Sequence, residues 1–433
     1  MSRILIKNGQ LIDPANHINQ LADISIVDGK IESVSKANTQ KAAQIDETNT
    51  HVINASGLIV SPGLVDCCAR LREPGQEHKA DIDSETIAAS YAGITTLCCP
   101  PDTDPVIDEP AVIELIHQKA ALSGHSKVVT LGALTAGLNG EHLSEMRALQ
   151  EAGCVGVSNA QKPVANTLVL KRAFAYAATF DLCVFIQPND YWLSLNGCAH
   201  EGIIASRLGL KGIPTSAETV AIASALQLIK ETGVQAHFGR LSTADAVTMI
   251  GRAKHDQLPI TADVSAHQLH LTELDISNFN SSCHVQPPLR TQRDQEALKQ
   301  GIANGIIDAI CSDHQPHEQD AKQAPFASTQ AGISGLETFL PLALRLNHSG
   351  IPMETIIRAI TQAPADILGL NSGRLSVGAE ADICIFDENE DWQLNSTAIH
   401  SKGLNTPFYG WNLQAKVKHT IVAGKLIEKR QKI

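Results

Sequence analysis

The sequence predicts an α/β fold: a (β/α)8 barrel of the TIM type joined to a small β-sandwich that both chain ends build. Two observations support this prediction. The middle of the chain alternates strand-like and helix-like segments, as a parallel barrel requires. Both ends instead contain short alternating apolar runs separated by glycine turns, which is typical of antiparallel sheets. We therefore expect a discontinuous β-sandwich domain from residues 1–60 and 370–433, and a barrel from residues 61–369.

The two ends of the chain carry the hairpin signals. Near the start, turns are expected at Asn8-Gly9 and at Asp28-Gly29, each between alternating apolar runs. Near the end, Ala381–Phe386 has the pattern of a strand, and Val417–Ile427 that of a hairpin around Ala423-Gly424. Because the ends of a domain often lie close together, these two β-rich segments are expected to share one domain.

The barrel is predicted from eight strand-like runs with helices between most of them. The expected strands are Val65–Arg70, Ile94–Cys99, Val128–Leu134, Cys154–Ser158, Leu182–Gln187, Val234–Phe238, Ile260–Ser265 and Ile306–Ser312. In such a barrel the chemistry lies at the carboxyl ends of the strands, so candidate site residues are sought there.

Two of the intervening helices carry start signals. The helix expected at Ser216–Glu231 opens with a capping box formed by Thr215 and Glu218. The helix expected at Glu145–Glu151 follows a candidate cap at Ser144.

Composition limits the class of function. The formal net charge is −12 at pH 7, which argues against a surface that binds nucleic acid or other polyanions. No apolar run is long enough to span a bilayer, and the first residues do not form an apolar leader. The ten cysteines form no C-x-x-C pair, so they are expected to be buried thiols in a reducing compartment. We expect a cytoplasmic protein without a membrane partner.

A motif at the first predicted barrel strand resembles that of a known family. Residues 62–75 read Pro-Gly-Leu-Val-Asp-Cys-Cys-Ala-Arg-Leu-Arg-Glu-Pro-Gly, where dihydroorotases carry D-x-H-x-H-L-R-E-P-G. The match continues, in order, at residues 93–96, 101–103, 287–290, 312–317, 375–382 and 405–407. Over nearly its whole length the chain is therefore similar to the dihydroorotase family of the amidohydrolase superfamily.

The resemblance implies a divalent metal site at the barrel mouth, where the metal polarises a cyclic amide and lowers the pKa of bound water. The six family ligand positions correspond here to Cys68, Arg70, Asn159, Gln187, Arg240 and Asp313. Only Asp313 keeps the family residue. A guanidinium stays protonated and has no lone pair for a metal, so Arg70 and Arg240 cannot ligate one. We expect the family zinc to be lost and no residue to be catalytic, with Asp313 a vestige.

Without a metal, a buried Asp313 would be costly unless it were paired. We expect Arg70 or Arg240 to occupy the vacated volume and neutralise it; the alternative is that both arginines turn out to solvent. By resemblance, the residues in substrate-binding positions are Arg72, Asp102, Gln286 and His317. Asp102 stands where the family has an asparagine and would repel a substrate carboxylate.

The resemblance is to one kind of family member in particular: an inactive dihydroorotase-like chain that assembles with the catalytic chain of aspartate transcarbamoylase and supports its activity. It implies a structural role in pyrimidine biosynthesis, as a homodimer within a larger hetero-oligomer.

Two alternatives remain open at this point. An active cyclic amidohydrolase could hold one metal on Cys68, Asp313 and either His267 or His314, and two further cysteines, Cys98 and Cys99, could assist. A sensor could instead bind an anionic pyrimidine precursor through Arg72 and His317.

Overall fold

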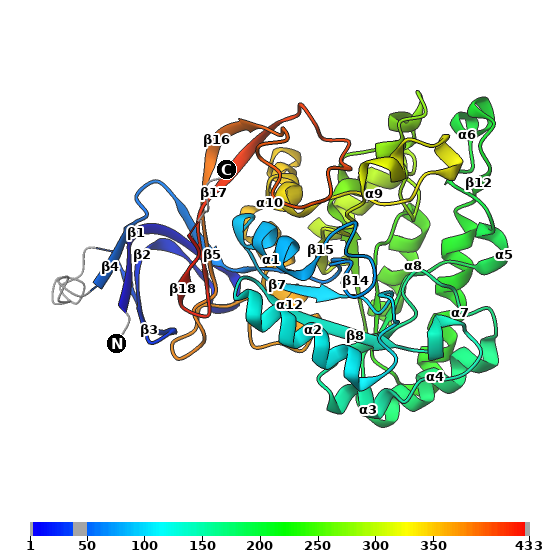
Figure 1. Cartoon of the computed structure of the whole chain (residues 1–433), viewed down its shortest axis with the longest axis horizontal. Coiled ribbons are helices and arrows are strands. Elements are labelled where there is room, and N and C mark those ends of the chain that lie inside the picture. The colour runs from blue at the N-terminus through cyan, green and yellow to red at the C-terminus, as the bar shows by residue number, and fades with distance from the viewer. Residues whose placement is uncertain (1–2, 38–49, 429–433) are drawn as a thin grey trace.

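A computed structural model of the chain describes residues 3–37 and 50–428. Its centre is an eight-stranded parallel sheet in the order β15-β14-β13-β10-β9-β8-β7-β6 (Figure 1). The strands are β6 (Leu64–Asp66), β7 (Ile94–Cys99), β8 (Lys127–Ala133), β9 (Gly156–Ser158), β10 (Val184–Ile186), β13 (Ala236–Phe238), β14 (Ile260–Ser265) and β15 (Ala309–Cys311). Each lies within or next to one of the eight predicted strands, so the predicted order is confirmed.

The sheet closes on itself at the seam between its first and last strands. Just beyond β6 and β15, Ala69 and His314 form a parallel bridge, and the amide of Arg70 donates to the carbonyl of His314 at 2.9 Å. The seam therefore brings the residues that follow β6 beside those that follow β15.

The described residues form α-helices, most of which lie around the barrel. They are α1 (Ile82–Tyr91), α2 (Pro110–Ser123), α3 (Met146–Glu151), α4 (Thr167–Thr179), α5 (Tyr191–Ser194), α6 (Ile203–Leu208), α7 (Ser216–Thr232), α8 (Ala244–His255), α9 (Gln292–Ala303), α10 (Leu336–Leu344), α11 (Met353–Ile360) and α12 (Gln362–Ile367). No helix in the described ranges is both long and apolar enough to cross a membrane.

Both predicted helices are present, but their predicted caps are wrong. Thr215 has helical backbone angles and makes no side-chain cap bond, because Glu218 is engaged elsewhere: its carboxylate accepts from the amide and the hydroxyl of Ser242. Likewise, the hydroxyl of Ser144 donates to the carbonyl of Ala133 rather than capping α3. Tertiary bonds outcompete the local capping motif at both positions.

A separate β-sandwich is built from the two chain ends, as predicted. Its strands are β1 (Arg3–Asp13), β2 (Ile18–Val27), β3 (Lys30–Lys36), β4 (Thr50–Asn54), β5 (Ile59–Pro62), β16 (Ile383–Gln393), β17 (Asn412–Val422) and β18 (Lys425–Leu426). Strand β5 joins the two ends, because it pairs with β1 on one side and with β16 on the other. Isoleucines such as Ile6, Ile24, Ile383 and Ile421 fill a core between them.

The hairpin predicted at Asn8-Gly9 is wrong. Strand β1 runs through these residues without turning, and the register against β2 shifts between Ile6 and Gly9, where Asn8 has a φ of 60°. The Asn-Gly pair therefore marks a bulge in one long strand. The hairpins predicted at Asp28-Gly29 and Ala423-Gly424 are confirmed, since they connect β2 to β3 and β17 to β18.

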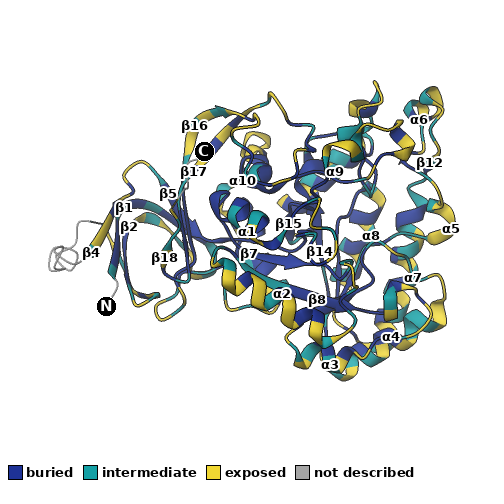
Figure 2. Cartoon of the chain, viewed as in Figure 1, coloured by how far each residue is buried: buried dark blue, intermediate teal, exposed yellow. Residues whose placement is uncertain are grey.

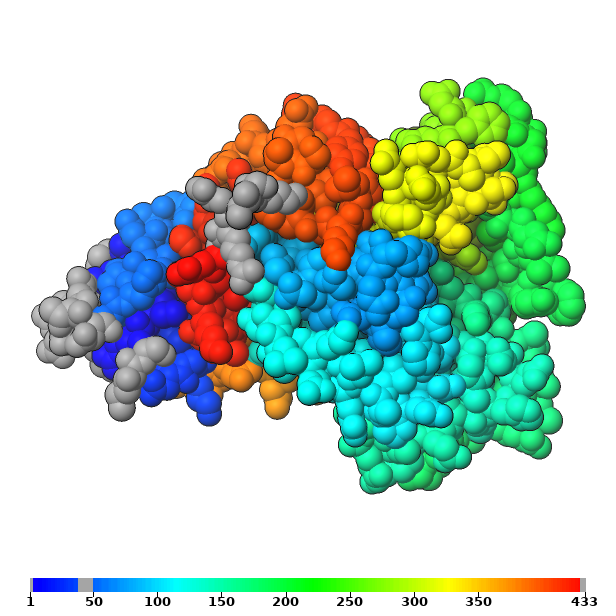
Figure 3. Space-filling view, viewed as in Figure 1, coloured from blue at the N-terminus to red at the C-terminus, as the bar shows by residue number. Residues whose placement is uncertain are grey.

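Between β10 and α7 the chain leaves the barrel in an excursion made of α5, α6 and a small parallel pair, β11 (Ala199–His200) and β12 (Gly212–Ile213). The excursion lies at the end of the molecule opposite the β-sandwich (Figures 1 and 3). It is held to the barrel by Arg290, which is buried and donates to the carbonyl of Ile213 at 2.6 Å and to His200 Nδ1 at 3.1 Å.

Candidate functional site

The candidate site lies at the carboxyl ends of the barrel strands. Cys68 and Arg70 follow β6, Gln187 follows β10, Arg240 follows β13 and Asp313 follows β15. These five residues form a connected cluster, which we call the mouth cluster together with Asp102. Its centre is closed to solvent, because Asp313 is 1% exposed and Arg70 and Arg240 are 4% and 7% exposed.

Arg70 pairs with two carboxylates. Its Nε donates to Asp102 Oδ2 at 2.8 Å, and its NH1 lies 3.5 Å from Asp313 Oδ1. Burial alone would raise the pKa of Asp102, but the charge and hydrogen bond of Arg70 outweigh burial and leave that pKa below its ordinary value. Asp102, expected only to repel a substrate, is thus the main partner of Arg70.

Arg240 fills the opposite side of the cluster. Its NH1 donates to Cys68 Sγ at 2.7 Å, its NH2 donates to Gln187 Oε1 at 2.8 Å, and its Nε lies 4.0 Å from Asp313 Oδ1. Burial raises the pKa of the Cys68 thiol to about 12, although Arg240 and Arg70 favour the thiolate. Cys68 is therefore a neutral thiol that accepts from Arg240. The predicted pairing of the arginines with Asp313 is present for both.

A buried pair, Asp263 and His237, fixes the backbone of Arg240. Asp263 on β14 accepts from the Arg240 amide at 2.5 Å, and its other oxygen lies 2.8 Å from His237 Nε2 on β13. Arg240 has a φ of 58° and Asp313 a φ of 46°, a region that residues other than glycine rarely adopt. Such strained positions persist where the surrounding contacts fix them, and they cluster at functional sites.

Asn159 does not join the mouth cluster. It follows β9 directly, but its side chain accepts from the hydroxyl of Thr135 at 2.6 Å and donates to the carbonyl of Lys162 at 2.8 Å. It therefore ties two loops together beside the mouth.

The residues in substrate-binding positions lie at one edge of the mouth. Arg72 NH2 is 3.1 Å from His317 Nε2, and Arg72 Nε donates to the carbonyl of Pro316 at 3.0 Å. Burial and the charge of Arg72 lower the pKa of His317 to about 2, so this imidazole is neutral. The carbonyl of Gln286 accepts from Gln187 Nε2 at 3.2 Å, so Gln286 reaches the cluster through its backbone.

The histidines of the alternative metal site are placed differently from each other. His314 points away from the mouth: its Nδ1 accepts from the amide of Gly335 at 3.1 Å, and its Nε2 is 2.8 Å from Glu85 of α1. His267 is fully buried, both of its ring nitrogens lack a hydrogen-bond partner in the described structure, and burial lowers its pKa to about 4. Cys98 and Cys99 are buried in the core.

The residues of the mouth do not fit the metal that the fold family implies. No group of three or more histidine, cysteine, aspartate or glutamate side chains within residues 3–37 and 50–428 is arranged to hold a metal ion. Two guanidinium groups stand around Asp313 instead, and neither offers a lone pair. A cavity lined in part by Cys68, Arg240 and Asp263 measures about 20 Å³, which is room for about one water molecule.

Sequence reasoning missed three contributors to this arrangement. Gln315 Nε2 donates to Asp313 Oδ1 at 3.1 Å, and Asp263 with His237 anchors Arg240. The signal for Asp263 and His237 was a charged or polar residue inside each of two buried strands. Nothing in the local pattern around Gln315 indicated its role.

The comparisons with known proteins agree with this fold. A family model described as "Dihydro-orotase-like" matches residues 57–246, and one described as "Amidohydrolase family" matches residues 282–427. Among solved structures, L-hydantoinase (dihydropyrimidinase) from Arthrobacter aurescens superposes with a TM-score of 0.87 over 100% of this chain and 97% of its own. At 22% identity that likeness concerns the fold alone.

Curated relatives match along their full length. A "Dihydroorotase-like protein" of Pseudomonas aeruginosa is 46% identical, covering 98% of this chain and 99% of the relative, and one of Pseudomonas putida is 44% identical, covering 97% and 98%. A "Dihydroorotase" of Geobacter sp. (strain M21) is 37% identical, covering 98% and 99%. The chain therefore belongs to the dihydroorotase-like family of amidohydrolases.

Proposed function

We propose that this chain is a catalytically inactive member of the family and serves as a structural partner of the catalytic chain of aspartate transcarbamoylase. In this proposal it acts as a homodimer within a larger hetero-oligomer. The observation that carries the loss of activity is the pair of guanidinium groups, Arg70 and Arg240, that stand 3.5 and 4.0 Å from the Asp313 carboxylate.

The electrostatics of the mouth cluster support inactivity. The family reaction needs a cation that can bind water and lower its pKa, and an open coordination position for that water. Here two arginines balance two aspartates, Asp102 and Asp313, so the cluster carries its own cations. A divalent ion placed among them would meet two fixed positive charges at short range in a buried setting. Arg70 is also kept protonated, since the charge of Asp102 raises the pKa of its guanidinium despite burial.

The partner role rests on different grounds. The described part of the chain forms both the barrel and the β-sandwich of the family, while side chains fill the barrel mouth. This suits a protein that acts through its shape and not through catalysis. The identity of the partner comes from the family resemblance. The relatives at 46% and 44% identity are named dihydroorotase-like, whereas those at 37–39% are named dihydroorotase, which agrees with a distinct branch.

Two measurements on the purified chain test the proposal. Elemental analysis is expected to find no stoichiometric zinc, and an assay with dihydroorotate is expected to show no turnover. Mixed with the aspartate transcarbamoylase catalytic chain at micromolar concentration, the protein should elute in one complex and raise the stability or activity of that enzyme. Stoichiometric zinc with dihydroorotate turnover would favour the active-enzyme alternative, and clean separation of the two proteins would remove the partner role.

A further inference from the structure

A group of large apolar side chains is exposed around the start of the excursion. Trp192 is 72% exposed, and its neighbours Tyr191 and Leu193 are 39% and 40% exposed. Leu168 on α4 and Val220 on α7 add two more, at 52% and 46%. We call these five residues the aromatic patch. Figure 2 shows α5 as an exposed edge of the molecule. Clustered apolar exposure of this kind marks an interaction site more often than scattered exposure does.

The backbone at the start of the excursion is anchored by hydrogen bonds. The Asp190 carboxylate caps α5 by accepting from the amides of Trp192 and Leu193 at 3.0 and 2.9 Å. The Asp190 amide in turn donates to the carbonyl of Ala217 on α7 at 2.7 Å. The backbone that carries the exposed rings is therefore fixed to the barrel before any partner arrives, which lowers the entropy cost of ordering this segment on binding.

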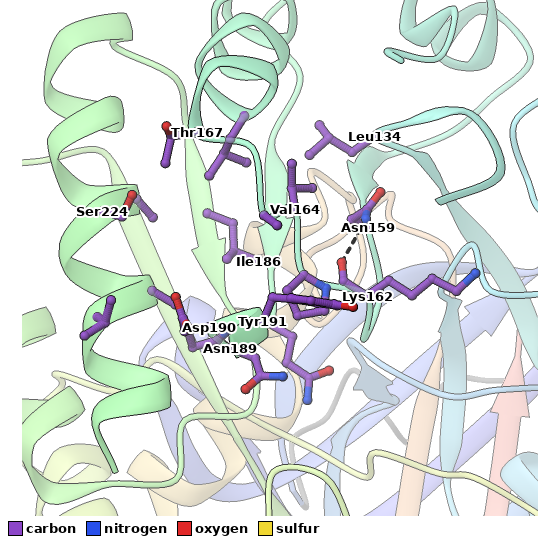
Figure 4. A pocket seen from close by; sticks show the side chains of 18 of the residues that line it. Leu134, Asn159, Lys162, Val164, Thr167, Ile186, Asn189, Asp190, Tyr191 and Ser224 are labelled. Atoms are coloured by element: carbon purple, nitrogen blue, oxygen red, sulfur yellow. Dashed lines mark hydrogen bonds between the residues drawn. The ribbon is translucent and has the colours of Figure 1, made fainter. Parts of the chain in front are cut away.

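A pocket of about 220 Å³ adjoins the aromatic patch, between α4, α5 and α7 (Figure 4). Tyr191, Trp192 and Val220 line it, and apolar residues such as Leu170 and Ile186 form its walls. This volume accommodates one large apolar side chain. Interfaces concentrate their binding energy where such an anchor enters a pocket and is surrounded by residues that exclude water.

Two exposed cations, Lys162 and Arg172, lie on the α4 side of the aromatic patch. Residues 152–180 contain no acidic residue, in a chain with a net charge of −12. The nearby charges of Lys171 and Asp190 are engaged within the chain, because Lys171 pairs with Glu231 and the Asp190 carboxylate caps α5. Lys162 lines the pocket opening and is exposed, as is Arg172 on α4. This is consequently a face on which an acidic partner would be attracted and not repelled.

We propose that the aromatic patch is the docking surface for the protein partner of this chain, and that the partner inserts an apolar side chain into the pocket with carboxylates facing Lys162 and Arg172. The inference rests on the proposed function for the existence of that partner and adds the place and chemistry of the contact. A second copy of this chain, or a small apolar molecule, would be a different occupant.

The experiment measures the affinity of the full-length chain for purified aspartate transcarbamoylase catalytic chain by calorimetry. Trp192→Ala is expected to weaken binding roughly 10- to 100-fold, as for loss of an aromatic anchor. The double variant K162E/R172E is expected to weaken it on the order of 10-fold at low salt and less at high salt. Two controls should bind like wild type: Leu122→Ala, whose leucine is 79% exposed on α2, and Lys425→Glu on β18.

The outcomes separate the two proposals. Wild-type binding that survives unchanged in both patch variants overturns the docking surface and leaves the partner role standing. No wild-type binding at all overturns the partner role, and the docking surface with it. Sedimentation of the chain alone adds a third outcome: if Trp192→Ala dissociates a wild-type homo-oligomer, the patch joins copies of this chain and the proposed occupant is wrong.

Discussion

The mouth cluster and the aromatic patch are only a few residues apart along the chain, since Gln187 belongs to one and Trp192 to the other. Their surfaces are built in opposite ways. The mouth is buried and densely charged, and its charges are paired with one another. The patch is exposed and apolar, and it adjoins an open pocket. The part of the barrel where this fold usually carries its chemistry is therefore closed, whereas the pocket beside it is open.

The largest effect should come from unbalancing the mouth cluster. Asp313→Asn leaves Arg70 and Arg240 facing one aspartate, so we expect the free energy of unfolding to fall by about 3 kcal/mol or more, as when one partner of a buried ion pair is removed. Urea unfolding at pH 7 measures this change. The matched control is Arg147→Ala, which breaks an exposed ion pair with Glu151 on α3 and should cost less than about 1 kcal/mol. Equal losses in the two variants would contradict a tightly coupled mouth.

A second effect concerns pH. His267 has a folded pKa of about 4, and its ordinary value is 6.5, so between these values the unfolded chain binds a proton that the folded chain does not. Its contribution to stability is therefore present above about pH 6.5 and is lost as the pH falls towards 4, by up to about 3 kcal/mol. His267→Gln should flatten the pH dependence of the unfolding free energy in this window. An unchanged slope would mean that His267 titrates alike in the folded and unfolded chain, and that burial does not lower its pKa.

A third and smaller effect is the coupling between Arg70 and Asp102. The single variants Arg70→Gln and Asp102→Asn and the double variant form a cycle whose coupling energy we expect to be about 1–2 kcal/mol, since the pair is close but Asp102 is 24% exposed. Urea unfolding of the four proteins gives the value. The same cycle on the exposed pair of Lys171 and Glu231 should give about 0.5 kcal/mol or less. Additive single effects at Arg70 and Asp102 would show that the two side chains are independent.

The smallest effect should come from the aromatic patch. Trp192→Ala removes a side chain that is 72% exposed, so the free energy of unfolding should change by no more than about 0.5 kcal/mol. Thermal unfolding of the isolated chain checks this. A large loss would indicate that the ring supports the excursion itself, and the contrast between a structural mouth and a free patch would then disappear.

Much of the fold could be predicted from the sequence because eight strand-like runs alternate with helices, which is the number and order of a (β/α)8 barrel. The wrong predictions concern local sequence motifs that occur in more than one structural context. Asn8-Gly9 can turn a hairpin or bulge a strand, and the strand pairing with β2 decides between them. Thr215 and Glu218 match a capping box, but Ser242, distant in sequence, takes the carboxylate.

Less of the site could be predicted, because contacts between strand ends depend on side-chain direction. The pairing of Arg70 and Arg240 with Asp313 followed from the cost of burying a lone charge. The stronger contacts, from Arg70 to Asp102 and from Arg240 to Cys68, did not, since they depend on how each arginine bends. The correspondence of Asn159 to a family ligand position did not indicate that its side chain turns towards Thr135.

Strand β5 has a consequence for synthesis of the chain. Its four buried residues, Ile59–Pro62, pair with β16, which begins only at Ile383. Residues 63–382 must therefore leave the ribosome before this edge can be covered, which takes on the order of tens of seconds at ordinary rates of translation. Throughout that interval an apolar strand edge is open to other nascent chains. The first strands made are thus among the last to be completed.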